Sequence, residues 1–246
     1  MVGLLAGLMP NKKLLSIKGS DWYLTKTKKI KDIPRIWIGH LSTRFSLKFL
    51  FKDIVVMSKR TRNEILSFNS KLNVHVVVDP IDLKKFYFKE TDKRVIKNIL
   101  FASVALDNPV KRYSLAKTSF ELLQKNNSNV NWYVLNNVPH NEVNKFINKA
   151  DVILLTSTHE GWPNVIKECL ACNVPFVSTD VSDLEEIANK TLNCFVVDEA
   201  DPKLLANAIE KSLKQGKNEN LRKFVEDFDM CLFKEKLFNI YNEIRT

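Results

Sequence analysis

The chain has 246 residues, of which 45% are hydrophobic and 27% charged, with only 6 Gly and 8 Pro. This composition is typical of a folded chain with one or two domains and excludes a disordered or low-complexity protein. The net charge of +10 comes from residues 11–62, which hold 14 Lys and Arg against 3 Asp. Such a segment suits an anionic partner, but no helix-turn-helix, zinc-finger or aromatic RNA-binding pattern accompanies it, so nucleic acid is not expected.

Apolar runs and cysteines indicate a cytoplasmic protein. No run approaches the roughly 18 uncharged apolar residues of a membrane span, and residues 1–10 lack a basic leader and a cleavage site. Four cysteines are too few for a disulfide framework in a chain of this size. Cys169 and Cys172 form a CxxC inside a predicted helix, where two buried thiols are expected instead of a redox pair, and no second pair lies nearby to complete a zinc site.

The first part of the chain predicts a partial sheet, with strands at residues 14–17, 53–57 and 74–78 and a helix at 43–52. This helix mixes aromatic, aliphatic and basic residues. A packed amphipathic helix is the favoured interpretation, and an interfacial membrane helix is the alternative. Residues 79–86 carry a proline and charges between apolar runs, which is typical of a linker. We therefore predict a first, partial domain over residues 1–86.

From residue 87 onward, short β-branched runs alternate with helical patterns, as in βαβ units with a parallel sheet. Strands are predicted at residues 98–102, 130–135, 152–156, 175–179 and 194–197, and helices at 110–123, 141–149, 164–171, 184–188 and 202–214. Five strands make a complete Rossmann-like domain over residues 87–225. Helices at 221–227 and 231–244 follow, and residues 226–246 could pack back on the first domain.

Two carboxylates mark the segment TSTHEGWPNVIKE at residues 156–168, which follows a buried strand and opens a helix. Glu160 is expected in the loop at the carboxyl end of the strand, where open α/β sheets bind ligands, and Glu168 in the following helix. The N–H groups of residues 161–165 would face an anion such as a phosphate, while a carboxylate accepts paired ribose hydroxyls. Spacing alone equally allows a surface loop residue and a solvated helix residue.

Residues 157–180, STHEGWPNVIKECLACNVPFVSTD, resemble the EGxPNxxxEAxACGxPxVxT pattern of the group 1 retaining glycosyltransferases. Asn173 and Ser182 stand where that family often has glycine. The resemblance implies an α/β fold of GT-B type, with a complete C-terminal and a partial N-terminal Rossmann-like domain. It also implies a nucleoside-diphosphate sugar as donor substrate.

The resemblance assigns a role to each candidate residue. Glu160 would contact hydroxyls of the donor sugar near the reacting carbon, and Glu168 would hold the ribose. Loop contacts to sugar and diphosphate would come from Gly161, Asn164 and Val165. Lys111 and Arg112 form a basic pair that would bind the diphosphate. Ser103 and Val104 stand in place of the family's Gly-Arg. Val138 lies in the loop 136–140, which would read the base. Taken alone, Lys111 and Arg112 read as solvated helix-end charges, and His140 and His159 read as loop residues.

The first domain resembles the family more weakly. Residues 14–21 look like the family's strand followed by HGSD, with Lys18 in place of histidine. Residues 57–64 are similar to a serine-containing strand end with its helix, and residues 79–86 stand where relatives read NGVDxxxF. This alignment implies a truncated N-terminal domain, lacking the family's first strands and glycine-rich loop. An open sheet edge of this kind would need a partner chain or an unusual small domain.

We therefore expect a retaining glycosyltransferase that acts on a glycan or lipid-linked acceptor in surface polysaccharide or lipopolysaccharide synthesis. No metal or cofactor is expected, because Asp227 and Asp229 lie between terminal helices, unlike the metal-binding DxD motif of the other glycosyltransferase fold. The expected location is cytoplasmic and peripheral on an anionic inner membrane face. The alternative is a nucleotide-sugar-binding subunit that lacks a complete acceptor site.

Overall fold

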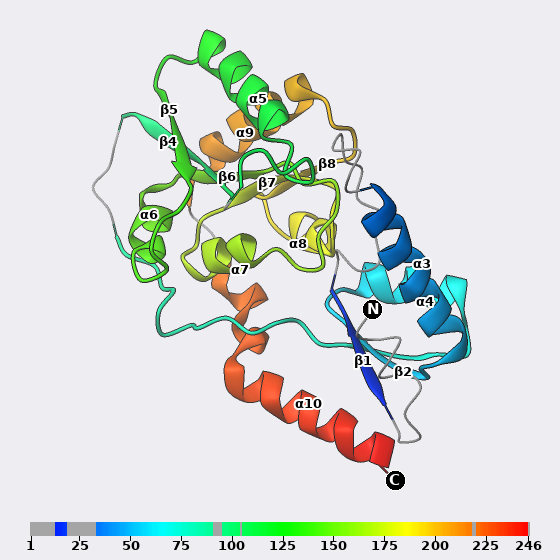
Figure 1. The fold of residues 1–246 in the computed structure, drawn as a ribbon. Helices are drawn as coiled ribbons and strands as arrows, with labels where there is room; N and C mark the ends of the chain where they lie inside the picture. The colour runs from blue at the N-terminus through cyan, green and yellow to red at the C-terminus, as the bar shows by residue number, and fades with distance from the viewer. Residues whose placement is uncertain (1–12, 19–32, 91–94, 104, 218–219, 246) are drawn as a thin grey trace. The chain divides into compact units, whose positions relative to one another are not determined.

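The computed structural model describes residues 13–18, 33–90, 95–103, 105–217 and 220–245, and its two units each contain a parallel sheet. Unit 1 comprises Met1–Pro80, His159–Trp162 and Met230–Thr246, and unit 2 comprises Ile81–Thr158 and Pro163–Asp229. The expected α/β fold class is confirmed (Figure 1). Residues 19–21 of the predicted HGSD-like segment and Val104 lie outside the described residues.

Unit 1 is built on three parallel strands in the order β1-β2-β3, namely β1 (Leu14–Ile17), β2 (Asp53–Val56) and β3 (Asn73–Val76). Side chains alternate between the two faces of such a sheet. Ile54 and Val56 therefore share one face with Ile17, whereas Val55 lies on the other. Both faces of the sheet are apolar, so both need a cover.

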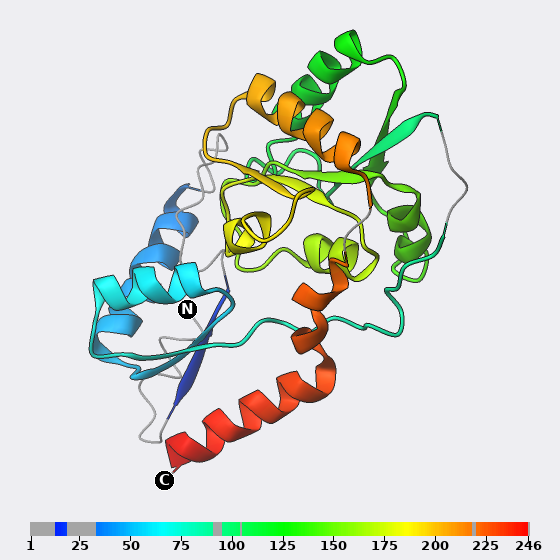
Figure 2. The ribbon, with the colours of Figure 1, turned by 180° about the vertical axis from the view of Figure 1, so that it is seen from behind.

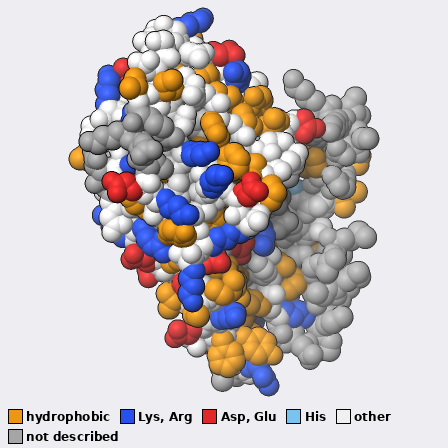
Figure 3. Space-filling view, turned by 90° about the vertical axis from the view of Figure 1, so that its left-hand side faces the viewer, with side chains coloured by type: hydrophobic (Ala, Val, Ile, Leu, Met, Phe, Trp, Pro, Cys, Tyr) orange, Lys and Arg blue, Asp and Glu red, His pale blue; other side chains and the backbone are white. Residues whose placement is uncertain are grey.

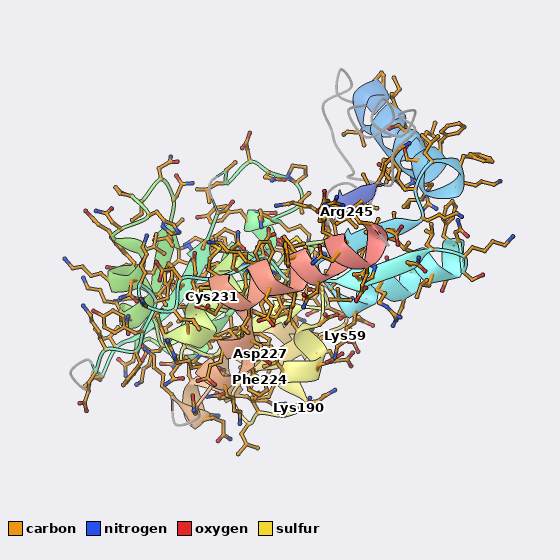
Figure 4. All side chains as sticks on the ribbon, turned by 90° about the horizontal axis from the view of Figure 1, so that it is seen from below. Lys59, Lys190, Phe224, Asp227, Cys231 and Arg245 are labelled. Atoms are coloured by element: carbon orange, nitrogen blue, oxygen red, sulfur yellow. The ribbon has the colours of Figure 1, made fainter. Side chains whose placement is uncertain are left out.

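Helices from the two ends of the chain cover this sheet. On one face, Leu47 and Ile65 join the core cluster from α3 (Ile33–Phe49) and α4 (Lys59–Phe68). On the other face, Val55 and Val77 form a cluster with Ile240 of α10 (Met230–Arg245). Figure 4 labels Lys59 at the start of α4, and Cys231 and Arg245 near the two ends of α10. The sheet of unit 1 is thus completed by the last helix of the chain.

Unit 2 contains a five-stranded parallel sheet in the order β5-β4-β6-β7-β8. The strands are, along the chain, β4 (Lys97–Ala102), β5 (Val130–Leu135), β6 (Val152–Leu155), β7 (Phe176–Thr179) and β8 (Phe195–Val197). All four residues of β6 and of β7 are buried. This burial explains the continuous apolar sequence of β6, because helices cover both faces of a parallel sheet. In β7 the buried hydroxyl groups of Ser178 and Thr179 donate to backbone carbonyls.

The helices of unit 2 divide between the two faces of the sheet. Helices α5 (Tyr113–Asn126) and α9 (Pro202–Gln215) lie side by side on one face, where Phe120 and Ile209 enter the core (Figures 1 and 2). The other face carries α6 (Val143–Lys149), α7 (Asn164–Ala171) and α8 (Leu184–Ala188) (Figure 1). Asp201 caps α9 by accepting from the backbone N–H groups of Lys203 and Leu204, as an N-cap aspartate does.

The segment that the sequence treats as a linker packs against unit 2. Phe86 is only 1% exposed, and the backbone N–H of Ile81 donates to the carbonyl of Phe228 at 2.8 Å. Arg222 donates to the carbonyls of Leu83 and Phe86, each at 2.8 Å. The structure therefore groups residues from Ile81 onward with unit 2, whereas the sequence places the domain boundary after residue 86.

Two elements differ most from their predicted extent. Helix α3 begins at Ile33, ten residues before the predicted start, and ends at Phe49. The helix predicted at residues 221–227 is wrong, because this stretch forms two short 3-10 segments, Arg222–Phe224 and Glu226–Phe228, on which Figure 4 labels Phe224 and Asp227. Leu221 and Val225 are each 0% exposed. The four-residue spacing of these two residues predicts a helix. In the structure, two 3-10 turns bury both side chains instead.

Asn173 and Ser182 occupy left-handed backbone conformations, with φ of 55° and 56°. This explains why these two positions resemble glycine positions of the family, since glycine adopts positive φ without a steric penalty. The side-chain Oδ1 of Asn173 also accepts from the backbone N–H groups of Leu221 and Arg222, at 3.0 and 3.2 Å. Asparagine therefore adds two hydrogen bonds that glycine lacks.

The CxxC cysteines are buried, as the sequence predicts. Burial raises the pKa of Cys172 to about 12, and it also raises the pKa of Cys169. The Sγ of Cys172 donates to Oδ1 of Asn144 at 3.1 Å. Thiols that stay protonated behave as small apolar side chains and not as redox nucleophiles.

Candidate functional site

The strand order of unit 2 has a switch point between β4 and β6, where a binding crevice is expected. The chain runs from β4 to β5 on one side and then crosses to β6 on the other side of β4. The loops that follow β4 and β6 therefore leave the sheet in opposite directions, and ligands of open α/β folds bind at such a switch point, beyond the carboxyl ends of the strands. The loop after β4 carries Lys111 and Arg112, and the loop after β6 leads into α7.

Arg112 connects these two loops. Its Nε donates to the carbonyl of Thr156 at 2.6 Å, and its Nη2 donates to the carbonyl of Ser157 at 2.8 Å. In return, the Thr156 hydroxyl donates to the carbonyl of Lys111 at 2.7 Å. The backbone N–H of Thr158 also donates to the carbonyl of Val110 at 2.9 Å. The guanidinium thereby fixes the edge of the crevice.

Burial and backbone geometry both act on Arg112. Desolvation lowers the pKa of its guanidinium, which nevertheless remains protonated at neutral pH. Its φ of 47° lies in the left-handed region, immediately before α5 begins at Tyr113. Two of its donor groups bind carbonyls of the β6 loop, and its positive charge adds to the field at the crevice. Contact with a diphosphate, by Arg112 or by Lys111, stays a prediction.

The N-terminus of α7 provides backbone donors beside the same crevice. Its N-cap residue is Pro163, and within the described part of the chain no side chain caps this end of the helix. The first two N–H groups of a helix have no intrahelical acceptor, and here they belong to Asn164 and Val165. Both residues reach the surface at least in part. An uncapped helix N-terminus favours an anion, since the helix dipole and the free N–H groups act together.

Glu168 lies in the second turn of α7, next to the loop that follows β5. Its Oε1 is 3.6 Å from Nε2 of His140, and the Glu168 side chain is 15% exposed. Nζ of Lys85 contacts Nδ1 of the same imidazole, which stands edge-on to the ring of Phe86. A lysine donating to Nδ1 leaves the proton on Nε2, the atom that faces the carboxyl group.

Burial determines the charge of Glu168. Desolvation raises its pKa to about 7, although the positive charges of Lys167 and Lys85 act in the opposite direction. At neutral pH the carboxyl group is therefore divided between its two protonation states. A carboxyl group near the surface whose pKa is raised to near neutral pH is typical of ligand-binding sites, because such sites bury ionisable groups that bind the ligand.

The loop after β5, which the resemblance predicts to contact the base, is anchored to the loop after β4. Nδ2 of Asn136 donates to the carbonyl of Ser103 at 2.7 Å, and Asn137 adopts a φ of 54°. Val138 follows and is partly buried. The loop thus brings Val138 and His140 toward the side of the sheet where Glu168 lies.

Basic side chains are spread over the face of unit 2 that carries α6, with fewer acidic ones among them (Figure 3).

Glu160 and Gly161 belong to the four residues, His159–Trp162, that group with unit 1. Both are partly buried, whereas Trp162 is buried at 5% exposure. The structure therefore brings together two sets of the predicted site residues: Lys111 and Arg112 with the β6 loop, and Glu168 with the loop that carries Val138. The role of Glu160 stays a prediction.

Sequence reasoning missed two contributors to this site. The sequence predicts that Lys85 lies in a linker and that His140 is an ordinary loop residue. Their contact joins positions 55 residues apart and arises only once the segment before β4 packs against unit 2. One signal was present, since residues 79–86 resemble a family motif, but that motif by itself assigns no ligand contact.

Comparison with known proteins finds similarity to glycosyltransferases. The sequence model of the glycosyl transferases group 1 matches residues 114–227. Over 103 residues the chain is 32% identical to the capsular polysaccharide biosynthesis glycosyltransferase CapM of Staphylococcus aureus, a match that covers 39% of this chain and 27% of CapM. Over 57 residues it is 37% identical to the putative teichuronic acid biosynthesis glycosyltransferase TuaC of Bacillus subtilis (strain 168), covering 23% of this chain and 15% of TuaC.

A similar fold occurs in solved structures. The crystal structure of a mutant of S. aureus TarM, in complex with Fondaparinux, alpha-GlcNAc-glycerol and UDP, superposes with a TM-score of 0.72 at 14% identity. That match covers 94% of this chain and 51% of TarM. The chain therefore spans about half of TarM, and its sequence matches cover about a quarter or less of the two curated relatives.

Proposed function

The chain belongs to the group 1 glycosyltransferases through its residues 114–227, and on this premise we propose that it transfers a sugar, with retention, from a nucleoside-diphosphate donor to a glycan or lipid-linked acceptor. The observation that carries the proposal is the crevice of unit 2. There an uncapped helix N-terminus, a basic pair and a largely buried carboxyl group follow neighbouring strands of one sheet. These groups suit the phosphates and the ribose of a nucleotide.

The donor would be held at four points. Glu168 would accept hydrogen bonds from the two ribose hydroxyls, next to His140. The N–H groups of Asn164 and Val165 would bind the diphosphate, together with the positive charges of Lys111 and Arg112. Backbone groups around Val138 would contact the edge of the base, and Gly161 would contact the sugar. The backbone N–H groups of Asn164 and Val165 belong to the first turn of α7, so this part of the proposed site would need little reorganisation on binding.

The proposed transfer keeps the anomeric configuration. The bond between the anomeric carbon and the phosphate oxygen breaks, and its electron pair leaves with the nucleoside diphosphate. The acceptor hydroxyl attacks the same face of the sugar and passes its proton to an oxygen of the leaving phosphate. Lys111, Arg112 and the α7 N-terminus would stabilise the charge on the leaving group, while Glu160 would hold sugar hydroxyls near the reacting carbon. We propose that no metal or other cofactor takes part.

The acceptor class is suggested by the matched relatives. CapM and TuaC are described as enzymes of capsular polysaccharide and teichuronic acid biosynthesis. We therefore propose a role in surface polysaccharide or lipopolysaccharide synthesis. The acceptor would be presented at a membrane, so we propose a cytoplasmic protein attached peripherally to the anionic inner face. The basic residues 11–62 support this location.

Calorimetric titration with UDP, GDP and ADP tests the donor site. We expect one nucleotide to bind selectively, and Glu168→Ala to weaken it about ten- to a hundredfold, since a hydrogen bond to a charged group contributes about 1.5–3 kcal/mol. Glu160→Ala should lower turnover far more than nucleotide affinity. Unchanged affinity in Glu168→Ala would contradict the ribose role.

A second candidate function is a nucleotide-sugar-binding subunit that works with a partner chain. Its distinguishing property is nucleotide binding without hydrolysis or transfer of the donor sugar. Incubating the chain with the donor whose nucleotide binds, with and without lipid-linked acceptors, separates the two functions. Release of free nucleoside diphosphate by the isolated chain supports the transferase.

A further inference from the structure

Helix α3 of unit 1 has an apolar face that points to solvent. Five large apolar side chains are each between 49% and 62% exposed: Trp37, Ile38, Leu41, Phe45 and Phe49. Four of them are spaced four residues apart, so at 3.6 residues per turn they follow one side of the helix and drift by only about 40° per step. The rings of Phe45 and Phe49 lie 5.0 Å apart, and a side chain added at Gly39 would meet nothing within 4 Å.

This outward face is not needed to hold the helix on unit 1. The inward side is supplied by other residues, among them Ser46 and Leu47, which are 3% and 0% exposed. A surface helix of a globular protein is normally polar on the side opposite its core stripe. Packing against the sheet therefore accounts for the apolar residues on the inward side of α3. It does not account for the apolar residues on the exposed side.

Basic residues accompany the apolar face, and acidic ones do not. Residues 33–52 contain no Asp or Glu. The guanidinium of Arg44 lies 5.1 Å from the ring centre of Phe68, which is 38% exposed at the end of α4, and Nζ of Lys48 lies 5.3 Å from the ring centre of Phe49. Lysine and arginine extend their charges past neighbouring apolar side chains in this way at the boundary between lipid and water.

We propose that this face of α3 docks on an anionic lipid surface. The helix would lie in the plane of the membrane, with its aromatic side chains among the acyl chain ends and Arg44 and Lys48 on the headgroup phosphates. None of the described helices combines the length and apolarity needed to cross a bilayer. Docking through one face requires neither property, since an interfacial helix is recognised by apolar residues beside basic ones.

Two other occupants fit the charges less well. The centre of a protein interface is depleted of lysine, whereas Lys48 lies beside the exposed phenylalanines. A second copy of the chain would meet the same face across a twofold axis and would bring like charges together. The inference concerns the location proposed above and does not depend on the transfer reaction.

Vesicle sedimentation without donor or acceptor tests the docking, so that its failure is distinct from failure of the proposed function. We expect the full chain to bind phosphatidylcholine vesicles that contain roughly 30% phosphatidylglycerol, and not pure phosphatidylcholine. Phe45→Gln should weaken binding about tenfold, and Lys48→Gln about fivefold. Phe238→Gln is the matched control, because Phe238 is 64% exposed on α10 of the same unit and should leave binding unchanged.

Trp37 provides a second readout. Its fluorescence should shift to the blue on anionic vesicles, and Trp37→Phe should abolish the shift while binding persists. Absence of binding to anionic vesicles overturns the proposal, and so does equal weakening by Phe45→Gln and Phe238→Gln. Concentration-dependent dimerisation in analytical ultracentrifugation that Phe45→Gln abolishes would instead assign the face to a second copy. Circular dichroism melts of each variant show whether a loss of binding reflects unfolding.

Discussion

At the scale of single residues, Glu168 combines burial with a charge that the proposed ligand needs. Its folded-state pKa of about 7 lies above the ordinary value of 4.5. Stability from the protonated carboxyl group is therefore fully present below pH 4.5 and is lost as the pH rises through about 7. Between pH 4.5 and about 7 the unfolded carboxyl group is ionised while the folded one stays protonated, and at higher pH the folded state must also ionise a largely buried group.

We expect Glu168→Gln to stabilise the protein at alkaline pH. The shift corresponds to about 3 kcal/mol, at about 1.4 kcal/mol per pH unit, and it should appear as a larger free energy of unfolding for the variant at pH 8. At pH 5 most of the difference should vanish. Urea unfolding of both proteins at the two pH values measures this, and a difference that is the same at both would contradict the assigned burial. The variant should also bind nucleotide less well, as stabilised sites often do.

Arg112 carries two opposing effects that substitution can separate. Arg112→Ala loses the hydrogen bonds to the carbonyls of Thr156 and Ser157 but keeps a side chain at positive φ. Arg112→Gly loses the same bonds and relieves the backbone. Both should unfold about 1–3 kcal/mol more easily than the parent, with the glycine variant about 1 kcal/mol more stable than the alanine variant. Equal stability of the two in chemical denaturation would contradict the strain at this position.

At the scale of elements, the strands of unit 2 were predictable because β6 and β7 are continuous buried runs with no solvent-facing side. The ends of the helices were harder to predict from the sequence. The start of α5 depends on the left-handed residue Arg112, and the length of α3 depends on contacts with the sheet of unit 1. The pair Glu160 and Glu168 was visible as a spacing, but the contacts of Glu168 with His140 were not, since they require the strands to be assembled.

Asn173 is expected to hold the junction between α7 and the 3-10 segment at Arg222–Phe224. Asn173→Gly keeps the positive φ but loses the bonds to the N–H groups of Leu221 and Arg222, so it should destabilise by about 1 kcal/mol. Asn173→Ala adds backbone strain and should lose about 2 kcal/mol. Thermal unfolding of both variants beside the parent checks this order, and an Asn173→Gly variant as stable as the parent would contradict the contribution of the side-chain bonds.

At the scale of the whole molecule, the two units are separate sheets, and unit 1 depends on α10 for the cover of one face. We expect Ile240→Ala to cost about 2–5 kcal/mol in that unit, because Ile240 packs on Val55 and Val77. Hydrogen exchange with mass spectrometry should show lost protection in β2, while β6 of unit 2 keeps its own. Tyr241→Ala, at a 52% exposed position of the same helix, should change neither. Equal loss in both sheets would contradict two independently stable units.

The return of α10 to the first sheet sets an order of events during synthesis on the ribosome. Strands β1 to β3 emerge before unit 2, yet the helix that shields Val55 and Val77 is made only after all of unit 2. At roughly 5–20 residues per second, many seconds pass between the two. Unit 2 can therefore fold while unit 1 still shows an uncovered apolar sheet face, and this nascent face is where a chaperone would be needed most.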